Sequence, residues 1–149
     1  MSGAHAIGDA AVNETTHQDG WPQPYRLPAA EPYWQGLADE QLKYQRCTHC
    51  GVAVWPAHSH CPHCGLCTLA WQVSSGRGKV YSFSTVMRGP TPVWQAIAPY
   101  TVGYVEMEEG YFLFTQFEGE ADGLRIGTQV KARFVRRGAQ TLPVFTPEQ

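Results

Sequence analysis

Long apolar segments and a secretory leader are both missing from this sequence. No hydrophobic run approaches the roughly 20 residues that a helix needs to cross a bilayer. No basic stretch followed by an apolar core opens the chain. We therefore expect a cytoplasmic protein. Hydrophobic residues make up 43% and charged residues 16% of its 149 residues, which is typical of a globular chain with one ordinary domain or two small ones sharing a core.

Basic charge is also scarce, since the formal net charge is −2. Nucleic-acid-binding domains usually carry a strong basic excess. The only local concentration of basic side chains lies near the C-terminus and comprises Arg125, Lys131, Arg133, Arg136 and Arg137. The composition therefore argues against nucleic acid as the main partner.

A catalytic constellation is the third absence. No Ser/His/Asp arrangement and no close carboxylate pair has a supporting spacing. We expect Glu106, Glu108 and Glu109 to face solvent around a hairpin. The glycine-rich stretch 75–79 lacks the spacing of a phosphate-binding loop, and a strand follows it where a helix would be required. We therefore predict no catalytic residue and expect the chemistry to reside in another chain.

The cysteines carry the most specific pattern in the sequence. Two Cys-x-x-Cys-Gly motifs lie at 47–51 and 61–65, with ten residues between Cys50 and Cys61. Each motif can present two thiolates from one tight turn, because the glycine lets the backbone turn back toward the sulfurs. Two such turns close a tetrahedral cage that suits zinc and leaves no open position for substrate, so we predict a structural zinc ion. The predicted ligands are Cys47, Cys50, Cys61 and Cys64.

Other interpretations of the cysteines fit less well. Disulfides are disfavoured by the expected cytoplasmic location and the paired spacing. Thioredoxin-like redox chemistry needs one Cys-x-x-Cys motif rather than two matched ones. Iron in a rubredoxin-like site stays open as an alternative to zinc. Cys67 is interpreted as a spare thiol outside the cage. The neighbouring histidines are expected to be exposed or to lie behind the ligands, and these are His49, His58, His60 and His63.

The chain divides into four predicted segments. Residues 1–29 form a flexible leader, because small and polar residues dominate it without periodicity. An N-terminal helix (30–44), a zinc ribbon (45–74) and a barrel (75–146) follow. The predicted fold is therefore mainly β.

The predicted helix carries more aromatic residues than one small core needs. Pro32 suits its first turn. Tyr33, Trp34 and Leu37 then place large apolar groups at mixed helical spacing. These side chains either pack on their own domain or dock to another chain, and the sequence leaves both possibilities open.

Beyond residue 76 the pattern indicates β structure. Two β-type runs flank Glu108-Glu109-Gly110, which is a good hairpin signal. Five short strands with no helical segment among them favour a closed barrel, of which the OB-fold is the commonest at this length. The expected strands are 78–87, 100–107, 111–117, 128–135 and 142–145. A long loop, 88–99, separates the first two and carries Trp94, and long ordered loops are often functional.

This succession of an aromatic helix, a four-cysteine ribbon and an OB-like barrel resembles a known family. It is the zinc-ribbon/OB-fold family associated with acyl-CoA metabolism, long catalogued as domain of unknown function thirty-five. The resemblance covers roughly residues 32–145. The residues that carry it are Tyr33-Trp34-Gln35-Gly36-Leu37, Gln45-Arg46-Cys47, both cysteine motifs, Trp55-Pro56, Trp71, Ser75-Gly76-Arg77-Gly78-Lys79-Val80-Tyr81-Ser82-Phe83, Ala98-Pro99-Tyr100, Glu109-Gly110 and Ile126-Gly127-Thr128-Gln129-Val130.

The resemblance implies a small non-catalytic subunit of a thiolase-like partner, either a ketoacyl-CoA thiolase or a thiolase-fold aldolase. Such a subunit supports the partner and helps form its acyl-CoA site, and a heterotetramer is implied. The acyl chain, whether steroid, aromatic or fatty, and the choice among thiolysis, retro-aldol cleavage and hydration stay open. In this setting Arg77, Lys79 and Arg88 can meet CoA phosphates. Trp94 can pack on pantetheine or on the partner.

Two alternatives belong to other functional classes. A nucleic-acid-binding module is one, because zinc ribbons and OB-folds both occur in that role. It requires exposed barrel aromatics beside a basic groove. The candidate aromatics are Tyr81, Phe83, Tyr104, Tyr111, Phe112 and Phe114. The other alternative is an independent enzyme, which activity of the isolated chain on acyl-CoA would reveal.

Overall fold

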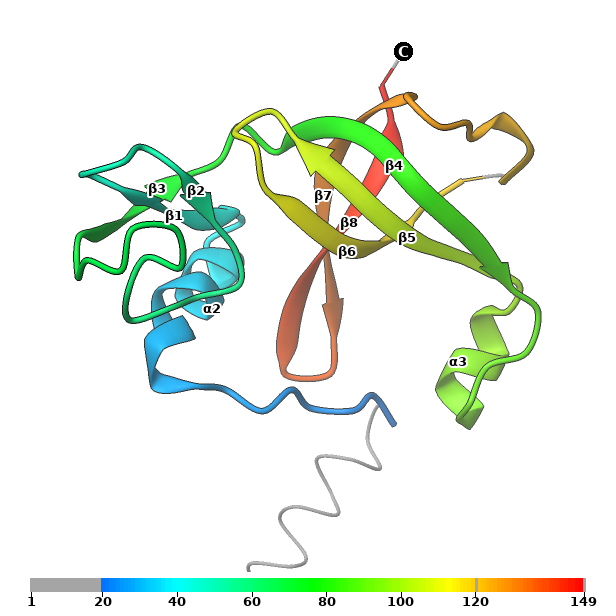
Figure 1. Cartoon of the computed structure of the whole chain (residues 1–149). Coiled ribbons are helices and arrows are strands. Elements are labelled where there is room, and N and C mark those ends of the chain that lie inside the picture. Colours follow the sequence, from blue (N-terminus) through cyan, green and yellow to red (C-terminus); the bar gives the residue numbers. More distant parts are fainter. Residues whose placement is uncertain (1–19, 120, 149) are drawn as a thin grey trace, which may run out of the picture.

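The computed structural model describes residues 20–119 and 121–148, so most of the predicted leader lies outside the described residues. Figure 1 shows a small sheet with a helix beside a barrel. The helical elements are η1 (Pro28–Ala30), α2 (Glu31–Ala38), α3 (Pro92–Ile97) and η2 (Ala121–Gly123). The strands are β1 (Lys43–Cys47), β2 (Ala53–Val54), β3 (Leu69–Val73), β4 (Arg77–Val86), β5 (Tyr100–Met107), β6 (Phe112–Phe117), β7 (Gln129–Arg137) and β8 (Gln140–Pro147). No helix among the described residues is long and apolar enough to span a bilayer.

The N-terminal helix is shorter than the predicted segment 30–44. It ends at Ala38, where the chain reverses: the Gln41 N–H donates to the Gly36 carbonyl at 2.8 Å. Glu40 takes a positive φ of 56° in this turn. A Cβ on Gly36 would lie 2.9 Å from the Gln41 carbonyl oxygen, so the close approach favours glycine. Tyr44 then lies on a strand, because its segment pairs with β3 rather than continuing the helix.

The zinc ribbon is a three-stranded antiparallel sheet in the order β2-β1-β3. Gln45 of the central strand pairs with Val54 on one side and Trp71 on the other. Each cysteine motif closes a tight turn, the first at the end of β1 and the second in the loop between β2 and β3. The N–H of Gly51 donates to the Cys47 carbonyl at 2.9 Å, and Gly65 repeats this contact with Cys61 at 2.8 Å. The two glycines have positive φ angles of 78° and 79°, which residues with a side chain rarely adopt.

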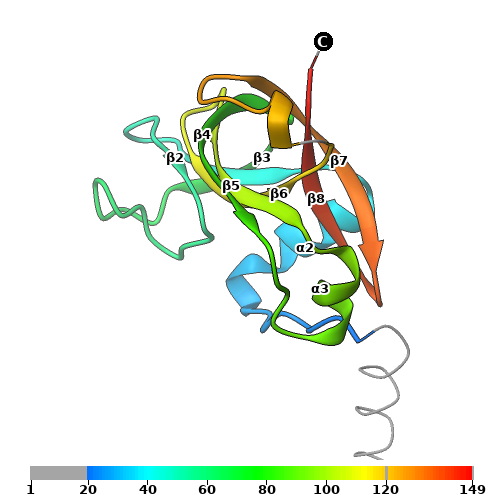
Figure 2. The ribbon, with the colours of Figure 1, turned by 90° about the vertical axis from the view of Figure 1, so that its right-hand side faces the viewer.

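Five strands close the barrel in the order β4-β5-β6-β8-β7, with β7 returning to β4. The pair β6–β8 is parallel and the others are antiparallel. Inward side chains such as Val80, Val105, Val130 and Phe145 are almost completely buried. The view turned by 90° shows the strands curving around into a barrel (Figure 2). The predicted mainly β fold, with a helix, a zinc ribbon and a five-stranded OB-type barrel, is confirmed.

The sequence predicted a long loop over 88–99. The centre of this loop instead forms the short helix α3. Pro92 occupies the first turn, where its missing N–H costs nothing. The Gly89 N–H donates to the Gln95 side-chain oxygen at 2.6 Å and closes the loop onto the helix. Figure 1 places α3 at the opposite end of β4 and β5 from the ribbon.

Ribbon and barrel share one core and one polar joint. Tyr33, Leu37 and Tyr44 belong to the same buried cluster as the barrel residues, and the Tyr44 ring stacks on Tyr111 with centroids 5.0 Å apart. At the joint, the Ser74 hydroxyl and the Ser75 N–H both donate to the Glu109 carboxylate at 2.7 Å. Glu109 was expected to face solvent; it is half-buried, and its carboxylate accepts two hydrogen bonds from the ribbon–barrel joint.

Candidate metal centre and apolar groove

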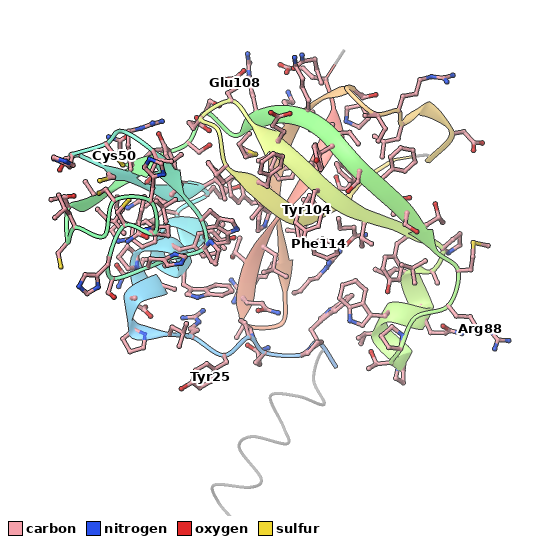
Figure 3. The ribbon with its side chains drawn as sticks, viewed as in Figure 1. Tyr25, Cys50, Arg88, Tyr104, Glu108 and Phe114 are labelled. Atoms are coloured by element: carbon pink, nitrogen blue, oxygen red, sulfur yellow. The ribbon has the colours of Figure 1, made fainter. Side chains whose placement is uncertain are left out.

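The four predicted ligands lie together. Their sulfur atoms are all within 4.8 Å of one another. The Cys47–Cys64 sulfur separation is 3.6 Å and the Cys50–Cys61 separation is 3.7 Å. A tetrahedral zinc ion with Zn–S bonds of about 2.3 Å requires sulfur separations of about 3.8 Å. The cage therefore fits zinc, and Figure 3 shows Cys50 in the ribbon, at its edge.

The electrostatics of the cage also call for a cation. The N–H of Cys50 and then the Thr68 hydroxyl hold the pKa of the Cys47 thiol down at about 5. At Cys64 the N–H of Leu66 favours the thiolate, but burial and the neighbouring sulfurs outweigh it and raise the pKa to about 12. Four thiolates at this spacing repel one another, so a divalent ion is what allows all four to ionise.

Two neighbours of Cys47 hold the ribbon loops in place. The buried Gln45 side chain donates to the His58 carbonyl at 3.0 Å and accepts from the His58 N–H at 2.8 Å. Arg46 donates to the Gly51 carbonyl at 2.7 Å. Neither residue was predicted to have a role in the ribbon, although the Gln45-Arg46 pair stands immediately before the first cysteine.

The histidines and the fifth cysteine stand apart from the cage. The His58 ring nitrogen Nδ1 lies 2.6 Å from the Pro56 carbonyl oxygen. Cys67 is exposed and outside the sulfur cluster. The Ser59 hydroxyl lies 3.0 Å from the His60 ring nitrogen Nδ1. Both residues are exposed neighbours in the sequence, and no acidic side chain among the described residues pairs with this histidine.

The residues considered for CoA phosphates do not converge. Arg77 and Lys79 lie at the start of β4, and Arg77 forms an ion pair with Glu148 at 3.3 Å. Arg88 follows the other end of β4, beside α3 and away from the ribbon (Figure 3). At about 3.3 Å per residue, the strand separates the two groups by more than roughly 20 Å. One small phosphate group cannot contact both.

The three helix residues considered for partner docking are divided by the fold. Tyr33 and Leu37 are buried in the chain's own core, with 6% and 0% of their surface exposed. Trp34 is half-buried and faces a groove. In this conformation only Trp34 of these three residues is exposed enough to contact another protein directly.

This groove, which the sequence did not reveal, has a volume of about 520 Å³. It lies where the N-terminal segment, α2 and the ribbon loop face the barrel. Its lining is largely apolar and includes Trp34, Trp55, Trp94 and Phe114, with Arg137 as its charged member. The residues come from segments far apart in the sequence, so no local spacing announces them.

Fold and site together define a class: a closed four-cysteine ribbon joined to an OB-type barrel. Two family descriptions match the chain, "ChsH2, rubredoxin-like zinc ribbon domain" over residues 34–65 and "ChsH2, C-terminal OB-fold domain" over residues 71–135. The zinc interpretation of the cage agrees with the first of these.

Comparison with individual proteins narrows the family further. It is 33% identical to a benzoylsuccinyl-CoA thiolase subunit BbsA from Geobacter metallireducens, over 70% of each chain. It is 33% identical to a probable enoyl-CoA hydratase alpha subunit from Thermomonospora curvata, over 77% of this chain and 36% of that protein's length. A solved structure titled "Ltp2-ChsH2(DUF35) aldolase" superposes with a TM-score of 0.76 at 31% identity, over 84% of this chain and 98% of that one. The chain belongs to the ChsH2-like, DUF35 family of zinc-ribbon and OB-fold proteins.

Proposed function

We propose that this chain is a non-catalytic subunit of a thiolase-like partner, a ketoacyl-CoA thiolase or a thiolase-fold aldolase. In this role it binds the partner and helps to form the acyl-CoA site for cleavage or formation of carbon–carbon bonds. The observation that carries the proposal is its membership of a family whose relatives are named as thiolase and aldolase components. We further propose a cytoplasmic heterotetramer.

The chemistry of the described residues supports a scaffold role. The cysteine cage has all four ligands from the protein and offers no position for substrate. The partner would then supply the nucleophile and the acid–base groups, while this chain contributes shape and contact surface.

An aromatic patch on the outside of the barrel suits the partner interface. We define it as Tyr81, Tyr104, Phe112 and Phe114, which are each 43% exposed or more. Tyr104 and Phe114 are cross-strand partners on β5 and β6, and both are labelled in Figure 3. Tyr81 packs on Phe112 with ring centroids 4.9 Å apart. Contiguous exposed aromatic surface of this kind is typical of protein interfaces.

For acyl-CoA we propose contacts at the α3 end of the barrel. Arg88 is exposed there for a phosphate, and Trp94 lines the groove where pantetheine can pack. At the other end, Arg77 is already paired with Glu148, and Lys79 lies beside Glu106 and Glu108. We therefore propose that this second pair contacts the partner rather than CoA.

Capture of the tagged full chain from its source cells tests the proposed function. The expected co-purifying protein is thiolase-like, and the recovered complex should turn over acyl-CoA whereas the isolated chain should not. Arg88→Ala and Trp94→Ala should weaken CoA binding to the complex, while Arg77→Ala should alter assembly instead. Recovery of no thiolase-like protein, or activity of the isolated chain, would refute the proposal.

The nucleic-acid alternative has one observation in its favour, the exposed aromatic patch. Its other requirement, a basic groove, is met poorly, because Glu106 and Glu108 lie near Lys79. Tyr111, one of its candidate aromatics, is buried in the core. A salt-dependent shift of single-stranded DNA or RNA by the full chain would favour this alternative.

A further inference from the structure

The apolar groove has the dimensions of a small-molecule site. Its volume of about 520 Å³ falls within the roughly 300–1,000 Å³ that ligand pockets occupy. Two indole rings form one wall around Tyr33: the ring centroid of Trp55 lies 4.4 Å from that of Tyr33, and Trp34 lies 5.3 Å from it. Phe114 and Leu142 belong to the barrel wall. Flat aromatic walls favour a ligand with rings or a compact apolar body.

Among the described residues that line the groove, Arg137 is the one with a charged side chain. Its guanidinium contacts two indoles that pack edge-to-face on each other, 4.7 Å from the centroid of Trp21 and 5.3 Å from that of Trp94. One nitrogen, Nη2, donates to the Gln116 side-chain oxygen at 2.5 Å. The two indole contacts and this bond fix the direction of the guanidinium, so its position is set before a ligand arrives.

This arginine lacks a carboxylate of its own among the described residues. Ion pairs there join Arg77 with Glu148 and Arg133 with Glu118, and neither includes Arg137. Glu118 is near enough to interact electrostatically with Arg137. Its carboxylate is already bound by Arg133, whose Nε donates to it at 2.7 Å. Desolvation lowers the pKa of Arg137 from its ordinary value. A half-buried cation in an apolar groove is stabilised when an anion pairs with it.

We propose that the groove binds an apolar, ring-containing monocarboxylate, with the carboxylate on Arg137 and the rings between Trp34, Trp55 and Phe114. A single fixed guanidinium matches one carboxylate, whereas a diphosphate would demand several cations. The groove is the one whose Trp94 was proposed above to pack on pantetheine. The site is tested with a free acid and this chain alone, so its failure and the failure of the proposed partner are distinguishable.

Calorimetry with the zinc-loaded full chain tests the site with two matched probes. The first is 2-naphthylacetate, and the second is the neutral amide of the same shape, 2-naphthylacetamide. The acid should bind at least about tenfold more tightly than the amide, because hydrogen bonds to a charged group contribute more than neutral ones. This preference should shrink at high salt.

Variants locate the two halves of the site. Arg137→Gln should remove the preference for the acid, whereas Arg136→Gln, which removes the same charge from an exposed neighbour on β7, should leave it unchanged. Trp34→Ala should weaken both probes by a similar factor. Zinc content and circular dichroism confirm that each variant is folded. If Arg137→Gln fails to fold, Arg137→Lys should retain part of the preference.

Several results would overturn the proposal. Equal affinity for acid and amide on the unaltered chain would remove the role of Arg137, and no binding of either probe would remove the small-molecule site. Protection of Trp34 by a bound protein, together with failure of both probes, would show that the groove is a protein interface.

Discussion

The ribbon and the barrel are each stabilised by a different kind of interaction. In the ribbon strands and loops, 43–73, the most deeply buried side chains include Cys47 and Cys61, which belong to the four-sulfur cage. In the barrel, they are Val80, Val105, Val130 and Phe145. The barrel is thus stabilised by apolar burial, whereas the ribbon needs its four sulfurs joined. The difference predicts that the two regions respond to different perturbations.

Removal of zinc should have the largest effect, and it should act on the ribbon. Structural zinc contributes apparent binding free energies of about 10–16 kcal/mol in small zinc domains. Chelation, or Cys61→Ser, should therefore abolish amide-exchange protection across β1–β3 while β5 and β6 remain protected. Hydrogen exchange followed by mass spectrometry measures both regions in one experiment.

Cys67→Ser is the matched control, because this thiol is exposed and lies outside the sulfur cluster. It should leave zinc content and exchange unchanged. Simultaneous loss of protection in ribbon and barrel on zinc removal would contradict the distinction between the two regions.

Truncation of the barrel core should come next in size. Phe145 is completely buried, and Phe→Ala substitutions in cores typically cost about 3–5 kcal/mol. Phe145→Ala should lower the free energy of unfolding by that amount without changing zinc stoichiometry. Chemical denaturation with parallel zinc analysis checks both parts. Phe112→Ala, at a ring that is 43% exposed, should cost far less. Equal costs would place the barrel's stability outside its core.

Loss of the joint between the two regions should have a smaller effect. Glu109→Gln removes the charge that receives two hydrogen bonds from Ser74 and Ser75. We expect a loss of about 1–3 kcal/mol and altered motion of the ribbon against the barrel. Glu108→Gln, at an exposed position on the same hairpin, is the control. An unchanged unfolding free energy for Glu109→Gln would show that the shared core alone joins the two regions.

Local patterns in the sequence predicted much of this architecture. Cysteine spacing identifies the metal ligands, since tight turns fix their geometry over a few residues. Alternation identifies the barrel strands, and β5 begins and ends at the predicted residues, Tyr100 and Met107. Tyr44 was misassigned to the helix because one large apolar residue fits either periodicity until its pairing with β3 is known.

Features that depend on long-range contacts were missed. Glu109 meets Ser74 from 35 residues away, and nothing in its hairpin motif reveals that partner. Tyr111 was counted among exposed aromatics, yet its ring stacks on Tyr44 across the ribbon–barrel boundary. The groove has the same origin: Trp34 and Arg137 come together only when the barrel closes against the helix and ribbon.

The most direct test of the proposed scaffold role is the zinc dependence of complex formation. The thiolase-like partner should bind the zinc-loaded full chain, and Cys47→Ser should abolish assembly before any effect on the partner's own chemistry appears. Analytical ultracentrifugation of the purified pair, with acyl-CoA turnover measured in parallel, provides both readouts. A zinc-free variant that still assembles a fully active complex would contradict the role we propose for the metal-held ribbon.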